Sequence, residues 1–260
     1  MPNPIAHPAA SIPFTRAGLV FSALVMGSLS PDFGYLIPLP TPYFMYTAMG
    51  LVLFDVPVGF ILLWLFHALV KWPMLSTLPE NLQRRLFKPA QGFSFGPRKR
   101  FLLILLSLLV GSITHVIWDS FTHEYGWTVQ HFAFLGISVG GIPLYTLLKN
   151  LGTLLGVCIL AYWFIRWLPK TPQSNQLPGR FPNKARIALF VGAIPALAVV
   201  AGAITYSRFM NKLPLTLEHW MVHDIMLSAG FIFALFVGLY CLAWLIAFHK
   251  TIRPARSSID

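Results

Sequence analysis

Long apolar stretches alternate with short polar segments along this 260-residue chain. A transmembrane helix needs about 20 apolar residues. Four stretches meet that length, at residues 45–70, 144–168, 186–206 and 222–248. A fifth, at 101–118, is shorter but rich in Leu, Ile and Val. The pattern predicts an all-α fold, a polytopic transmembrane helix bundle with five full spans.

The N-terminal region fits two arrangements. Residues 18–30 are apolar but make a helix only about 20 Å long, which is a short span. Alternatively, residues 5–14 enter the membrane, the chain turns near residues 16–18, and residues 18–30 return as a re-entrant hairpin. Re-entrant backbone is tolerated where other helices cover it, so both arrangements stay open.

The composition restricts the class of protein. Hydrophobic residues make up 56% of the chain and charged residues 10%, against about 45–50% and 25% in soluble domains. These values exclude a water-soluble enzyme, a disordered chain and a nucleic-acid-binding protein of ordinary composition. Membrane lipids are the expected partners, and the pattern sets no oligomeric state.

Charge gives the expected orientation. Most of the 19 Lys and Arg lie in residues 71–100, 166–186 and the C-terminal tail. Basic loops stay on the cytoplasmic side. We therefore expect a multi-pass protein of the inner (cytoplasmic) membrane with a cytoplasmic C-terminus, and with residues 30–45, 119–143 and 207–221 facing outward.

A Pro-, Asn- and Gln-rich run at residues 170–183 marks the expected domain boundary. Cys158 and Cys241 both lie in apolar stretches, so no disulfide framework is expected. The expected segments are a membrane domain at 1–168, a cytoplasmic linker at 169–183, a two-helix membrane hairpin at 184–249 and a basic cytoplasmic tail at 250–260.

Candidate chemistry collects on the outward side. His115, Asp119 and His123 are spaced four residues apart, so they form one stripe if their helix continues. Imidazole and carboxylate groups on adjacent turns can share a divalent ion such as zinc. Asp32 lies on the same predicted side, and His7 joins it only in the hairpin arrangement. Alternatively, the His–Asp pair caps the helix.

Asp55 lies in the middle of an expected span. An intramembrane carboxylate is costly and is therefore a functional candidate, although it can also bond to a neighbouring helix or to the backbone freed by Pro57. We expect it to face the bundle interior, toward Arg16 or Thr47.

A second group of polar residues on the outward side consists of His219, His223 and Asp224. We interpret them as polar residues of the membrane interface.

Five motifs carry a family resemblance. They are His7-Pro-Ala-Ala10, Ser28-Leu-Ser-Pro-Asp32, Leu53-Phe-Asp-Val-Pro57, His115-Val-Ile-Trp-Asp-Ser-Phe-Thr-His123 and Pro143-Leu-Tyr145. In this order they resemble the bacterial membrane family catalogued as domain of unknown function 4184. The likeness runs over most of residues 4–170 and implies a membrane protein without an established activity.

A more distant likeness implies a metal. The order of His, Pro-Asp and HxxxD motifs is similar to membrane-bound metal-dependent hydrolases and to zinc-dependent phospholipase C. Carried over by motif, the implied ligands are His7, Asp32, His115 and Asp119, with His123 as a candidate fifth. The hydrolases usually show Thr-His-Ser between the last two motifs, whereas this chain has Tyr46-Thr47-Ala48.

Two functional hypotheses follow. In the first, a divalent metal ion, zinc, activates water to hydrolyse a lipid or lipid-linked phosphoester, and His123 or Glu124 transfers protons as the catalytic acid or base. In the second, the protein is a non-catalytic membrane scaffold or carrier with a polar path through Asp55.

Overall fold

The computed structural model describes residues 6–36, 44–179, 181–182 and 236–248. Its internal contacts divide the chain into two compact units. Unit 1 comprises residues 1–66 and 93–172, and unit 2 comprises residues 67–92 and 173–260. The described residues are predominantly helical, with a single two-stranded ribbon among them.

Unit 1 begins with a helical hairpin. Helix α1 (Pro8–Ser11) continues into the 3-10 segment η2 (Ile12–Ala17), and helix α2 (Phe21–Leu29) continues into η3 (Ser30–Leu36). Gly18 joins the two arms with φ of 82°, a left-handed conformation that only glycine adopts at little cost. The backbone therefore has the hairpin form, and its two ends approach each other closely enough to share a site.

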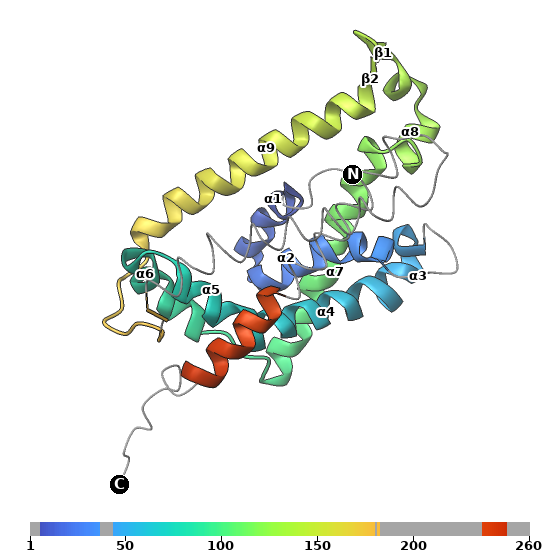
Figure 1. Ribbon diagram of the computed structural model, residues 1–260. Helices are drawn as coiled ribbons and strands as arrows, with labels where there is room; N and C mark the ends of the chain where they lie inside the picture. Colours follow the sequence, from blue (N-terminus) through green and yellow to red (C-terminus); the bar gives the residue numbers. More distant parts are fainter. Residues whose placement is uncertain (1–5, 37–43, 180, 183–235, 249–260) are drawn as a thin grey trace, which may run out of the picture. The chain divides into compact units, whose positions relative to one another are not determined.

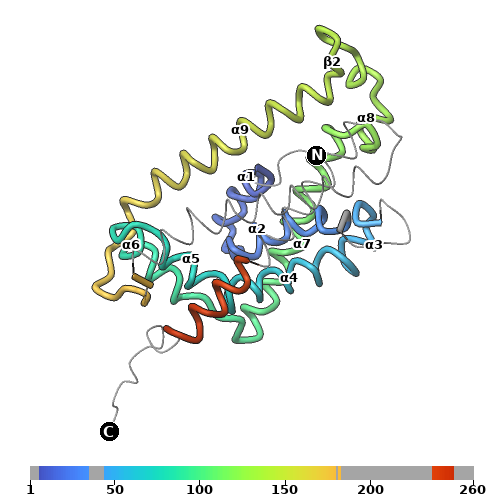
Figure 2. Tube along the Cα trace, in the orientation of Figure 1, coloured from blue at the N-terminus to red at the C-terminus, as the bar shows by residue number. Residues whose placement is uncertain are grey.

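Helix α7 (Arg98–Thr122) packs along α2, as Figures 1 and 2 show. The contact is close and partly polar. The Ser112 hydroxyl donates to the Gly27 carbonyl at 3.0 Å, and the Val20 amide donates to the Ser107 hydroxyl at 2.9 Å. Small residues let helices approach closely in membranes, and hydroxyl groups then bond across them.

A long helix that comes before α7 in the chain runs without interruption from Ala48 to Thr77. Its residues up to Phe66 belong to unit 1, and those from His67 onward belong to unit 2. Its segments are α3 (Ala48–Gly50), the π-helical η5 (Leu51–Asp55), α4 (Val56–Leu65), the π-helical η6 (Phe66–Val70) and α5 (Lys71–Thr77). Pro57 lacks an N–H group, so the widened turn η5 falls where the regular bonding ladder is interrupted.

Short elements connect α7 to the last described helix of unit 1. They are α8 (Trp127–His131), η7 (Ala133–Gly136), β1 (Ser138–Val139) and β2 (Ile142–Pro143). The strands pair antiparallel around Gly140 and Gly141, which have φ of 61° and 83°. Two such glycines suit a tight hairpin turn. Helix α9 (Leu144–Trp167) follows, and η8 (Leu168–Lys170) ends it.

Unit 2 has its own aromatic core. Helix α6 (Glu80–Gln91) contributes Phe87, which packs with Trp72 and Trp244. Trp244 lies in the helix Phe236–Phe248, and its indole N–H donates to the Gly179 carbonyl at 2.8 Å. Unit 2 therefore has a buried core of its own.

Three described helices are long and apolar enough to cross a membrane: Ala48–Thr77, Arg98–His131 and Leu144–Lys170. They contain nearly all of the expected spans 45–70, 101–118 and 144–168. The expected span 186–206 and the group at residues 219–224 lie outside the described residues, as does the first half of span 222–248. The structure therefore supports a membrane-type helical protein with three candidate spans among the described residues, and not the count of five.

Candidate metal centre

His115 is fully buried on α7 and faces the end of α2. Its Nδ1 atom lies 2.7 Å from the Ser28 carbonyl oxygen, a group near the helix end where carbonyls lack helical partners. A carbonyl only accepts, so Nδ1 carries the proton and donates it. In the neutral ring Nε2 then keeps its lone pair, on the side where the carboxylates lie.

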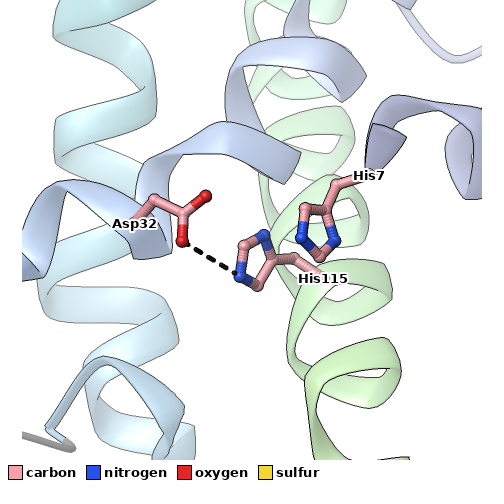
Figure 3. Close-up of side chains that lie close together, drawn as sticks. All are labelled: His7, Asp32 and His115. Atoms are coloured by element: carbon pink, nitrogen blue, oxygen red, sulfur yellow. Dashed lines mark ion pairs between the residues drawn. The ribbon is translucent and has the colours of Figure 1, made fainter. Parts of the chain in front are cut away.

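His7, Asp32 and His115 form a compact triad (Figure 3). One ligand atom from each lies within 4.8 Å of the other two. His115 Nε2 is 3.8 Å from Asp32 Oδ1, and the rings of His7 and His115 stack with centroids 3.9 Å apart. His7 immediately precedes α1 and Asp32 lies in η3, so the N-terminal hairpin brings both of its ends to α7.

Asp119 lies one turn after His115 and joins the same cluster. Its Oδ2 is 3.1 Å from His115 Nε2, and its Oδ1 is 3.8 Å from His7 Nε2 and 3.4 Å from His123 Nδ1. Helix α7 ends at Thr122, and His123 follows in extended backbone. The predicted stripe of His115, Asp119 and His123 therefore ends just beyond the helix. His123 still contacts Asp119 from there.

Tyr46 belongs to the cluster, although the sequence did not single it out. Its hydroxyl donates to Asp119 Oδ2 at 3.0 Å. The residue lies in η4 (Phe44–Tyr46), directly before Thr47. No spacing or motif in the sequence pointed to it.

Several buried atoms of the cluster have no hydrogen-bond partner among the described residues. They are both ring nitrogens of His7, Asp32 Oδ2 and Asp119 Oδ1. Buried polar atoms in proteins nearly always have a hydrogen-bond partner. An ion bound at the cluster is one explanation for the atoms that have none. Two ligands of one zinc ion lie within about 4.2 Å of each other. The 3.8 Å between His115 Nε2 and Asp32 Oδ1 meets that limit, while the three ligand atoms of the triad lie within 4.8 Å of one another. The triad therefore comes close to the spacing that a divalent ion needs.

Burial shifts the titration of the two groups contributed by the hairpin. It raises the pKa of Asp32 to about 6, against an opposing attraction from His115. It also lowers the pKa of His7 to about 3, with the neighbouring His115 acting in the same direction. His7 is therefore neutral at pH 7 and keeps a lone pair for an ion.

Asp55 is 0% exposed in the widened turn η5, so it faces the interior of unit 1. Neither of its carboxylate oxygens has a hydrogen-bond partner among the described residues. It lies close enough to His115 for an electrostatic interaction. The expected partners are engaged elsewhere or exposed: Thr47 caps α3 through the Gly50 amide, and Arg16 lies at the surface.

A pocket lies beside Asp119. The aromatic side chains of Tyr46, Tyr125 and Trp127 line it, and the other lining residues are Val116, Asp119, Ser120 and Gly126. The pocket therefore borders the Asp119 side of the cluster. Glu124 is exposed and is not among the lining residues.

A model of the family described as a domain of unknown function, DUF4184, matches residues 1–246. The chain belongs to the DUF4184 family. No curated protein and no solved structure matches it.

Three separate motifs of this DUF4184 chain meet at the cluster. His7, the Pro31-Asp32 pair and the His115–Asp119 pair come from distant segments, yet their side chains lie within a few ångströms. Asp55, from a fourth motif, lies near them. Pro143 and Tyr145 of the fifth motif instead mark the start of α9, where they take no part in the triad.

Proposed function

We propose that this DUF4184 protein is a membrane-embedded, metal-dependent hydrolase acting on a lipid or lipid-linked phosphoester. One observation carries the proposal. Three ligand groups, the buried His7 and His115 and the half-buried Asp32, come from distant segments and lie within 4.8 Å of one another. Within this triad, both ring nitrogens of His7 and Oδ2 of Asp32 have no hydrogen-bond partner among the described residues, which supports an ion at this point.

His7, Asp32 and His115 would hold the ion, with Asp119 as the adjacent fourth ligand. The mixed nitrogen and oxygen donor set suits zinc. Both ring nitrogens of His7 lack a hydrogen-bond partner among the described residues, so either could serve as its ligand atom. Ser28 orients His115 from behind, as groups outside the ligand shell commonly do for metal-binding histidines.

A bound zinc ion lowers the pKa of a water molecule toward 7 and polarises a phosphoryl oxygen. The surrounding side chains would position and move protons. His123 contacts Asp119 at 3.4 Å and borders the cluster, so it is the favoured proton carrier. Glu124, the other candidate, is exposed. Tyr46 holds the Asp119 carboxylate in place through its hydroxyl.

For the topology we infer five full spans and a re-entrant N-terminal hairpin in the inner (cytoplasmic) membrane. The cluster then faces outward, the C-terminus lies in the cytoplasm and lipids are the partners. Three candidate spans support this arrangement, as does a hairpin whose two ends meet at α7. The bias of basic residues toward alternate loops supports the orientation.

Metal analysis of the purified protein tests the proposal. We expect about one zinc ion per chain, lost in the double variant His115→Ala, Asp119→Ala. His7→Ala is the gentler variant, because it removes a ring without hydrogen-bond partners among the described residues. His131→Ala removes an exposed imidazole outside the cluster and is the matched control. Equal, near-zero metal in all of these proteins would remove the hydrolase hypothesis.

A second candidate is a carrier with a polar path through Asp55. Its support is the fully buried carboxylate without hydrogen-bond partners in the described part of the chain. A carrier of this kind predicts faster decay of a pH gradient across proteoliposomes holding the wild-type protein than across those holding Asp55→Asn. The hydrolase predicts equal decay rates for the two.

A further inference from the structure

The segment between α7 and α9 exposes an unusually apolar surface. From Tyr125 to Leu148 the chain contains no Lys, Arg, Asp or Glu. Yet most of its large apolar side chains are exposed, including Trp127 at 65%, Phe134 at 55% and Ile137 at 59%. Contiguous apolar patches of this kind mark a surface that meets a partner or a membrane.

The local fold holds these side chains outward. Trp127 stacks on His131 at 4.2 Å, and Phe132 packs edge-on against Phe134 at 6.2 Å. Leu135 is buried and anchors η7 from beneath. Farther along, the β1–β2 ribbon exposes Val139 and Ile142 beside its glycine turn. We name the surface formed by residues 127–142 the apolar platform.

The platform includes the last five residues of one candidate span, which ends at His131, and reaches to the start of the next at Leu144. Figure 1 shows α8, β1 and β2 gathered at one end of α9. The ends of membrane-spanning helices lie near the boundary between hydrocarbon and head groups, where Trp is enriched. A charge-free segment can enter this layer without desolvating an ion, and it gains by burying its apolar side chains.

We propose that the apolar platform is immersed at the boundary between the head groups and the acyl chains of the membrane, and that its partner is the lipid surface. The side chains that contact acyl chains at this boundary are Trp127, Phe134, Ile137 and Val139. Trp127 also lines the pocket beside Asp119, so a lipid head group at the edge of the platform lies next to the cluster. This last step rests on the proposed hydrolase, whereas the immersion of the platform does not.

Depth-dependent quenching in lipid nanodiscs tests the immersion. A single cysteine at Val139→Cys, with Cys158 and Cys241 replaced by Ala, carries an environment-sensitive fluorophore. The nanodiscs contain phosphatidylcholine and phosphatidylglycerol, and they leave both membrane faces open to solvent. Asn81→Cys on the charged helix α6 is the control, because Asn81 is polar and exposed. Ile142→Cys on β2 is a second reporter, which guards against a local disturbance at residue 139.

We expect lipids spin-labelled just below the head group to quench both platform reporters several-fold more than the label at residue 81. Aqueous iodide should show the opposite order. Iodide quenching equal to that of the control would overturn the proposal. Protection from both quenchers would overturn it as well, because it would mean that protein, such as a second copy of this chain, covers the surface. The same pattern is expected with and without added zinc, so the result is independent of the metal hypothesis.

Discussion

Gly27 of α2 lies directly against the backbone of Leu108 in α7. A Cβ atom at residue 27 would overlap the Leu108 carbonyl group, and one at Gly111 would overlap the Leu24 carbonyl. The two helices therefore approach more closely than any larger side chain allows. This approach brings the Ser28 carbonyl within reach of His115.

Gly27→Ala or Gly111→Ala should therefore separate α2 from α7. We expect each variant to lose about 1–3 kcal/mol of stability through overpacking, and to bind zinc more weakly because His115 and Asp32 move apart. Thermal unfolding in detergent and metal analysis measure the two effects. Gly136→Ala is the control, since nothing lies within 4 Å of an added Cβ there. Unchanged unfolding in the α2 and α7 variants would contradict the packing argument.

His115→Asn separates the two functions of this imidazole. The shorter amide can still donate to the Ser28 carbonyl but has no counterpart of Nε2. We expect both His115→Asn and His115→Ala to lose the ion. Only the alanine variant also leaves a buried acceptor unbonded, at a cost of about 1–3 kcal/mol. Metal content and unfolding midpoints in chelator-treated samples distinguish the two effects, and zinc retained by the Asn variant would rule out Nε2 as a ligand.

Zinc affinity should fall in acid because of Asp32. The pKa of this buried carboxyl is raised to about 6, and a ligand must lose its proton to bind a metal. Above pH 6 the carboxylate is ready to bind. Below it, protons compete, and Asp32 alone weakens binding by about tenfold per pH unit. His7, with a pKa of about 3, adds nothing over this range.

Competition titration with a zinc-sensitive dye between pH 5 and pH 8 measures this dependence. Asp32→Asn should weaken binding at pH 7.5 and flatten the slope between pH 6 and pH 5. A wild-type slope that the Asn variant reproduces would assign the acid sensitivity to another group.

Tyr46→Phe tests whether the phenol positions Asp119. Losing the 3.0 Å hydrogen bond should cost about 1 kcal/mol of stability and weaken zinc binding only a few-fold, since the phenol is not a ligand. Tyr162→Phe, on the exposed surface of α9, should change neither quantity. Complete loss of metal in Tyr46→Phe would instead place the phenol oxygen among the ligands.

The helical class and three candidate spans followed from uninterrupted apolar runs, whose length and composition decide whether they can cross a membrane. The N-terminal arrangement did not follow, because spacing cannot show how a segment folds back. The left-handed turn at Gly18 shows that the chain folds back on itself there.

The candidate site was predictable in its residue types and less so in its contacts. The four-residue spacing places His115 and Asp119 on one helix face whatever the rest of the chain does. His7, by contrast, lies more than a hundred positions away in the sequence, and only tertiary packing brings it there. Tyr46 was not predictable, because no spacing or motif distinguishes it from the other aromatic residues of the chain. Only the folded structure shows that its hydroxyl donates to the Asp119 carboxylate.

The hairpin between His7 and Asp32 has a consequence for folding if the proposed ion is bound. A metal held by both of its ends and by α7 would be a reversible cross-link that closes residues 7–32 into a loop. Free-energy coupling between metal binding and folding is general for such sites. Chelation should then release this N-terminal segment first, ahead of any wider unfolding, and a protease added outside the membrane would reach it only in the metal-depleted protein.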